Sequence, residues 1–155
     1  MYSIKKQTIK LLNLPLTDYG NAQRLKLIFG NRWVYLPRYK NWVFYDEHCW
    51  RGKKTMHARW AAADAFRLLA KEIYRLPAPP DEYELDKRVR AIAWLTKSQL
   101  DYHVKNAVNF FKEMCLNEQI PIWTKKYHWT VINAVYSGSG NSGDTFLFKY
   151  LHPVS

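Results

Sequence analysis

The chain is poor in cysteine, in acidic residues and in long apolar runs. Two cysteines among 155 residues, Cys49 and Cys115, cannot form the disulfide framework that a small secreted fold needs. The first apolar stretch, residues 11–16, is interrupted by Asn13 and Pro15. It is therefore too short for the core of a signal peptide and far too short to span a bilayer. These shortages predict a cytoplasmic protein in a reducing compartment.

The shortage of acidic residues leaves a large positive charge. Lysine and arginine number 24 against 13 aspartates and glutamates, which gives a formal net charge of +11. Such a surplus favours association with polyanions, first nucleic acid and then anionic membranes. Because 48% of the residues are hydrophobic, the chain can fill a sizeable core, and its length predicts a single domain over residues 1–155.

The first third of the chain predicts a short helix followed by a β-hairpin. Thr17 or Asp18 is a suitable N-cap for a helix over residues 19–29, whose apolar side chains fall on one face. Two aromatic runs, 32–36 and 41–46, are separated by a short proline-containing connection, which is typical of hairpin strands with a longer loop.

The middle of the chain predicts three helices, over residues 57–76, 82–94 and 99–116, with Ser98 as the cap of the last one. Residues 117–155 form a β-rich tail that predicts a C-terminal β-hairpin, and the fold class is α+β. The side chains expected to face the core are Trp60, Ala63, Phe66, Leu69, Ala70 and Ile73 in the first helix, Leu85, Val89, Ile92 and Ala93 in the second, and Leu100, Val104, Ala107, Val108 and Phe111 in the third.

Residues 17–51 interleave cations with aromatic rings, the two components of a surface for single-stranded nucleic acid. The cations are Arg24, Lys26, Arg32, Arg38, Lys40 and Arg51, and the rings are Trp33, Tyr35, Tyr39, Trp42, Phe44, Tyr45 and Trp50. About half of the rings are expected to build the core, among them the three tryptophans. Residues 51–55 are expected to form an exposed basic turn. The predicted nucleic-acid-binding residues are Arg38, Tyr39, Lys40, Arg51, Lys53, Lys54 and Arg59.

Potential metal ligands do not have a recognisable spacing. His48, Cys49 and His57, with Cys115 as a fourth ligand, lack the separations that let side chains surround one tetrahedral ion. Five scattered histidines match no serine–histidine–aspartate arrangement. We therefore expect no metal site and no catalytic residue.

A glycine-rich segment, residues 138–145, has the spacing of a phosphate-binding P-loop. Asp144 stands where the loop's lysine belongs, and a carboxylate there repels phosphate. ATP hydrolysis and a nucleotide cofactor are therefore not expected, and any role of this segment stays open.

The order of several motifs resembles the domain that precedes the helicase in phage and plasmid primase–helicase proteins and in a related poxvirus protein. The matching elements are Thr17-Asp-Tyr-Gly-Asn-Ala-Gln-Arg24, Trp33-Val-Tyr-Leu-Pro37, Trp42-Val-Phe-Tyr-Asp46 with Trp50, and Trp94-Leu-Thr-Lys-Ser98. The resemblance covers residues 14–116. It implies a freestanding copy of this accessory domain, acting in the cytoplasm of a bacterial host cell.

The resulting hypothesis is a non-catalytic DNA-binding accessory protein of a bacteriophage or mobile element that acts in replication. Single-stranded DNA is the favoured partner, with a separately encoded helicase or primase as a further one. One alternative is a phage inhibitor that binds a host defence complex, as anti-CRISPR proteins do. Another alternative, a metal-dependent nuclease, lacks suitably spaced carboxylates.

Overall fold

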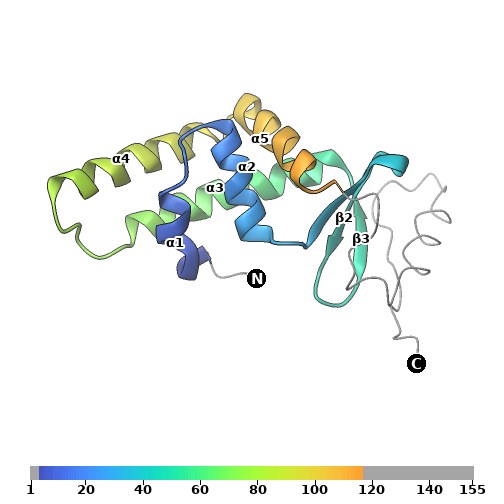
Figure 1. Cartoon of the computed structure of the whole chain (residues 1–155), viewed down its shortest axis with the longest axis horizontal. Coiled ribbons are helices and arrows are strands. Elements are labelled where there is room, and N and C mark those ends of the chain that lie inside the picture. Colours follow the sequence, from blue (N-terminus) through green and yellow to red (C-terminus); the bar gives the residue numbers. More distant parts are fainter. Residues whose placement is uncertain (1–3, 117–155) are drawn as a thin grey trace. The chain divides into compact units, whose positions relative to one another are not determined.

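A computed structural model describes residues 4–116 and gives an α+β fold, as the sequence predicts (Figure 1). These residues divide into two compact units. Unit 1 contains residues 4–30 and 59–114, and unit 2 contains residues 31–58 together with 115–116. The elements in chain order are α1 (Ile4–Leu12), α2 (Asp18–Phe29), β1 (Trp33–Leu36), the 3-10 turn η1 (Pro37–Tyr39), β2 (Asn41–Tyr45), β3 (Trp50–Lys53), α3 (Thr55–Tyr74), α4 (Glu82–Lys97) and α5 (Asp101–Met114).

Unit 1 is helical, and α2 packs against α5 at its centre (Figure 1). Thr17 caps α2, because its hydroxyl accepts a hydrogen bond from the backbone N–H of Gly20 at 2.9 Å. The rings of Phe29 and Phe111 lie 6.0 Å apart where the two helices meet. The predicted face of α5 is largely confirmed, since Val104, Ala107, Val108 and Phe111 are all buried.

Three details of unit 1 differ from the sequence-based expectation. Helix α1 was not predicted, and Ser98 ends α4 and does not cap the next helix. Five predicted core residues are exposed: Trp60, Leu85, Val89, Ala93 and Leu100. Helix α4 carries two apolar stripes, and the buried one contains Ala91 and Leu95. Periodicity alone cannot choose between two stripes on one helix.

Unit 2 is a three-stranded antiparallel sheet with the order β1-β2-β3. The predicted hairpin is confirmed: Val34 lies opposite Val43 in the β1–β2 pair. The predicted basic turn at residues 51–55 is wrong, because most of it belongs to β3, which pairs with β2. Trp50 and Gly52 are buried on this strand, which explains why a segment rich in lysine and arginine forms part of the sheet.

On its other edge, β1 contacts the chain that leaves α5. The backbone N–H of Tyr35 donates to the carbonyl of Cys115 at 3.0 Å, and Tyr35 and Leu116 form a parallel bridge. The predicted C-terminal hairpin and the segment 138–145 lie outside the described residues. Among the helices of residues 4–116, none combines the length and the apolar character that a bilayer span requires.

Candidate nucleic-acid interface

The tryptophans of the sheet are structural, as the sequence predicts. Trp33, Trp42 and Trp50 are all almost completely buried. Trp33 meets Trp42 edge to face with ring centroids 5.7 Å apart, and Tyr35 meets the same ring at 5.3 Å. Such edge-to-face pairs add stability beyond the area they bury. None of these three tryptophans can present a face to a nucleic-acid base.

The turn between β2 and β3 is organised by Asp46. One carboxylate oxygen of Asp46 accepts hydrogen bonds from the backbone N–H groups of His48 at 3.1 Å and Cys49 at 2.9 Å. Its other oxygen accepts from Nε of Arg51, with which it forms an ion pair. Burial alone raises the pKa of Asp46, but the hydrogen bonds from Cys49, Arg51 and His48 outweigh it and hold this pKa far below its usual value.

The depressed pKa makes the turn acid-sensitive. Because the unfolded chain binds the Asp46 proton first as pH falls, the stability due to this group is complete at neutral pH and is lost below about pH 4. We expect Asp46→Asn to lower stability at pH 7 and to reduce the difference between pH 7 and pH 3. Urea unfolding followed by tryptophan fluorescence measures both. Asp64→Asn, on the exposed face of α3, is the control and should retain the full difference. An unchanged pH dependence in Asp46→Asn would contradict the assignment.

A second ion pair lies at the same end of the sheet. Arg32 contacts Glu47 at 3.4 Å, donates from Nε to the carbonyl of Tyr45 at 3.1 Å, and lies over the ring of Phe44. With Arg51 on Asp46, both acids of residues 31–58 are paired with arginines. Arg51 is therefore engaged in holding the turn, although the sequence placed it in the interface.

The opposite end of the sheet carries the predicted loop residues. Pro37 begins η1, and Lys40 ends it in the left-handed conformation, with φ 49° and ψ 37°. Arg38 and Lys40 are exposed, and the Arg38 guanidinium lies 6.0 Å from the centre of the half-exposed Tyr39 ring. A cation stacked near an accessible ring is the arrangement that a flipped-out base can join.

Strand register brings two further lysines to this end. Lys53 lies opposite Trp42, so the end of β3 lies beside the start of β2. Strand β2 begins at the residue that follows Lys40. Lys54 follows Lys53, is exposed, and its backbone N–H donates to Nδ1 of His57 at 3.1 Å. Five of the seven predicted residues therefore gather at one end of the sheet: Arg38, Tyr39, Lys40, Lys53 and Lys54. Arg59 belongs to unit 1 and is half-buried.

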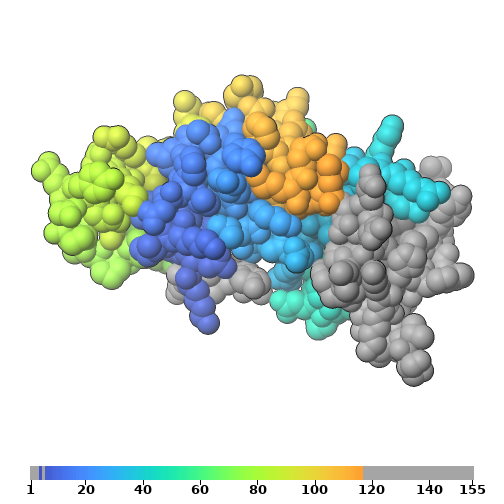
Figure 2. Space-filling model, in the orientation of Figure 1, coloured from blue at the N-terminus to red at the C-terminus, as the bar shows by residue number. Residues whose placement is uncertain are grey.

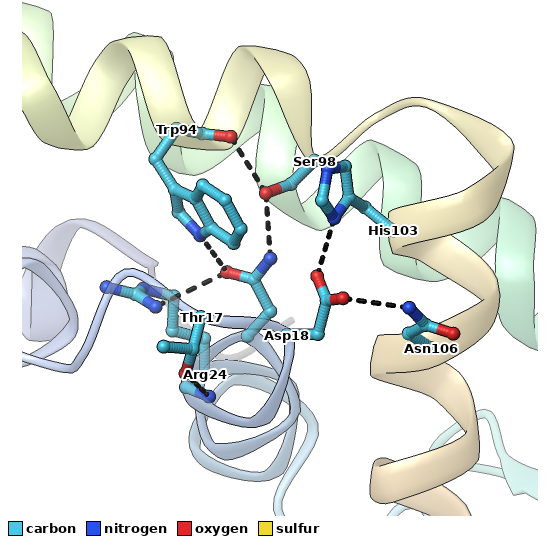
Figure 3. A network of polar contacts seen from close by, with 9 residues as sticks. Thr17, Asp18, Arg24, Trp94, Ser98, His103 and Asn106 are labelled. Atoms are coloured by element: carbon cyan, nitrogen blue, oxygen red, sulfur yellow. Dashed lines mark hydrogen bonds and ion pairs between the residues drawn. The ribbon is translucent and has the colours of Figure 1, made fainter.

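The motif at residues 17–24 has a structural role within unit 1 (Figure 3). The Asn21 side chain is fully buried, accepts from Nε1 of Trp94 at 3.1 Å and donates to Oγ of Ser98 at 2.8 Å. Asp18 lies 2.8 Å from Nδ1 of His103 and accepts from the amide of Asn106 at 2.9 Å. The first motif and the Trp94–Ser98 motif are therefore joined by hydrogen bonds between α2 and α4.

Arg24 does not face solvent, contrary to its expected role as a phosphate contact. It is 1% exposed and donates from Nε to Leu11 O at 3.1 Å, from Nη1 to Pro15 O at 2.7 Å and from Nη2 to Leu14 O at 2.6 Å. Among residues 4–116 no carboxylate pairs with it. Burial lowers the pKa of Arg24 to about 10, so the side chain remains charged at neutral pH.

Cys49 and Cys115 are both buried and not joined in a disulfide. Burial raises the pKa of the Cys49 thiol, and the negative charge of Asp46 raises it further. Within the part of the chain that the structure describes, no group of three histidine, cysteine or acidic side chains is placed to hold a metal ion.

The fold and these motifs define a domain of the pre-helicase type. A family model described as "D5 N terminal like" matches residues 22–141, and the chain belongs to this family, the pre-helicase domain of primase–helicase proteins. The match begins inside the motif at residues 17–24 and extends beyond the residues described here. No curated protein and no solved structure matches the chain.

Proposed function

We propose that the protein is a non-catalytic accessory factor of phage or mobile-element replication that binds DNA, preferably single-stranded, through the η1 end of its sheet. Membership of the pre-helicase family supports a place in replication. The residues that bind are Arg38, Tyr39, Lys40, Lys53 and Lys54, while Arg51 supports them by holding the β2–β3 turn.

The separation of charge along the sheet is the observation that carries this proposal. Residues 31–58 contain six cations and two acids, and both acids are neutralised by arginines at the end opposite η1. Positive charge at the η1 end is therefore not offset by a neighbouring carboxylate of this segment. Arg38 and Lys40 contact phosphates, and Tyr39 stacks on a base between them.

Removing three of these cations is expected to weaken DNA binding. The variant Arg38→Ala/Lys40→Ala/Lys53→Ala should lose roughly tenfold or more in affinity for single-stranded DNA, and the slope of log K against log salt should fall by about 2, since each lost phosphate contact removes about 0.7. Fluorescence anisotropy with a labelled oligonucleotide at several salt concentrations measures both quantities.

A matched control removes the same charge from unit 1. In Arg67→Ala/Lys71→Ala/Arg75→Ala all three cations are exposed: Arg67 and Lys71 belong to α3, and Arg75 directly follows it. Two of them, Arg67 and Arg75, form ion pairs with neighbouring acids. This variant should keep most of the affinity. Equal losses in both triple variants would show that net charge alone governs binding, and unchanged affinity and slope in the first variant would refute the interface.

Replacing Tyr39 tests the proposed preference for single-stranded over duplex DNA. Tyr39→Ala should weaken binding to single-stranded DNA by about tenfold, since stacking contributes on the order of 1–3 kcal/mol per base, and should change binding to duplex DNA much less. The same anisotropy assay with matched single- and double-stranded oligonucleotides measures the difference. Equal effects on both substrates would contradict stacking by Tyr39.

A further inference from the structure

Helix α4 carries an apolar stripe that nothing in unit 1 covers. Leu85 and Val89 are 48% and 56% exposed, Ile92 is half-buried, and Thr96 is exposed. Their spacing of four, three and four residues is the spacing of the contact positions in a two-helix coiled coil. Ala91 and Leu95 occupy the other face of the helix and fill the core. In Figure 2 the yellow-green surface of α4 and of the loop before it forms an outer edge of unit 1.

Charges of opposite sign lie at the two ends of one flank of this stripe. Glu82 and Asp86 occupy the first half of α4, and Arg90 and Lys97 occupy the second half. At 100° per residue these four positions fall within an arc of about 80° beside the stripe. Asp86 and Arg90 pair with each other at 2.7 Å. Glu82 and Lys97 are exposed and have no ion-pair partner among the described residues.

We propose that α4 pairs in an antiparallel manner with the α4 of a second copy of this chain. In a twofold-symmetric antiparallel pair the same flank of each helix faces its counterpart. Glu82 then lies beside Lys97 of the second copy, and the reciprocal contact forms at the other end. The apolar stripes meet along the middle, with Val89 near the twofold axis. Parallel pairing would instead set this flank against the opposite flank of the second helix, where Glu82 and Lys97 could not form the two reciprocal contacts, so the charge pattern favours the antiparallel arrangement.

This association is expected to be weak and independent of the proposed DNA interface. One pair of helices buries less surface than a standard protein–protein interface, and interfaces of that size are typical of weak, transient association. Sedimentation equilibrium of the nuclease-treated full chain over a range of concentrations measures it, since nuclease treatment prevents nucleic acid from bridging two copies. Val89→Asp should abolish self-association without unfolding the protein, because this side chain is already more than half exposed.

Charge reversal tests the pairing residue by residue. Glu82→Lys places two lysines together at each end of the pair, and Lys97→Glu places two glutamates there. Each variant alone should associate roughly tenfold more weakly, because two exposed ion pairs become two repulsions. An equimolar mixture of the two variants should regain the original affinity as a heterodimer, since both contacts are then attractive. Lys105→Glu, the same charge change on an exposed residue of α5, is the control and should leave association unchanged.

Several results would each overturn the proposal. They are a monomer at every concentration tested, association that Val89→Asp leaves intact, charge-reversal variants that associate like the original chain, and a mixture that fails to recover. Binding of a different protein to the α4 stripe of a monomeric chain would assign the stripe to that partner and equally refute self-pairing. DNA affinity measured on the Val89→Asp variant keeps this result separate from the proposed function.

Discussion

Arg24→Ala is expected to destabilise unit 1 by about 3–5 kcal/mol. The substitution leaves the carbonyls of Leu11, Leu14 and Pro15 without their buried donor and opens a cavity beside α2. Arg24→Lys should recover only part of the loss, because one ammonium cannot reproduce the geometry of a planar guanidinium. Urea unfolding followed by circular dichroism, which reports on the helices of unit 1, measures the change.

The control for Arg24 is another arginine of the same unit. Arg67 is exposed and contacts only Asp64 in its own helix, at 3.3 Å, so Arg67→Ala should change stability by less than about 0.5 kcal/mol. If Arg24→Ala also lowered stability by less than about 0.5 kcal/mol, water would be replacing the hydrogen bonds of Arg24. That result would contradict the structural role of the motif at residues 17–24.

Gly20→Ala is expected to destabilise the protein by more than about 2 kcal/mol, opposite in sign to the usual effect of this change. Alanine is normally about 1 kcal/mol better than glycine inside a helix. At position 20, however, an added Cβ would lie 2.0 Å from the carbonyl oxygen of Pro15, which is backbone and cannot move aside as a side chain can. The same oxygen accepts the hydrogen bond from Arg24, so displacing it also weakens that contact.

A matched substitution separates this clash from helix propensity. Asn109 is exposed within α5, and Asn109→Ala should stabilise the protein by a few tenths of a kcal/mol. Thermal unfolding of both variants under one condition gives the comparison. If Gly20→Ala were neutral or stabilising, the close approach of α2 to the chain at Pro15 would be wrong.

Local signals predicted the elements of this fold better than they predicted its surfaces. The Thr17 cap, the proline-containing hairpin loop and the buried face of α5 depend on neighbouring residues, and all are present. Which stripe of α4 is buried depends on its partners in three dimensions. Ser98 and Trp94 form hydrogen bonds with Asn21 of α2. These bonds fix the rotation of α4 about its axis, so that Ala91 and Leu95 are the buried residues.

The candidate interface shows the same limit. The sequence correctly grouped Arg38, Tyr39 and Lys40 in one loop, because they are adjacent in the chain. It could not distinguish cations that face solvent from cations whose hydrogen bonds and ion pairs stabilise the fold. Arg24 is held by carbonyls that precede it by nine to thirteen residues, and Arg51 by an aspartate across a turn. All of these residues are cations in the same stretch of sequence, and only their tertiary contacts show which of them face solvent.

Arg24 is held by hydrogen bonds to buried backbone carbonyls, and this makes the stability of unit 1 insensitive to ionic strength. Carbonyl dipoles sheltered from the medium are barely affected by dissolved ions, whereas attraction between lysines and a polyanion weakens steeply as electrolyte is added. A salt concentration high enough to release nucleic acid from the proposed interface should therefore leave the helical unit folded, so the chain can be purified without polynucleotide before its affinity for DNA is measured.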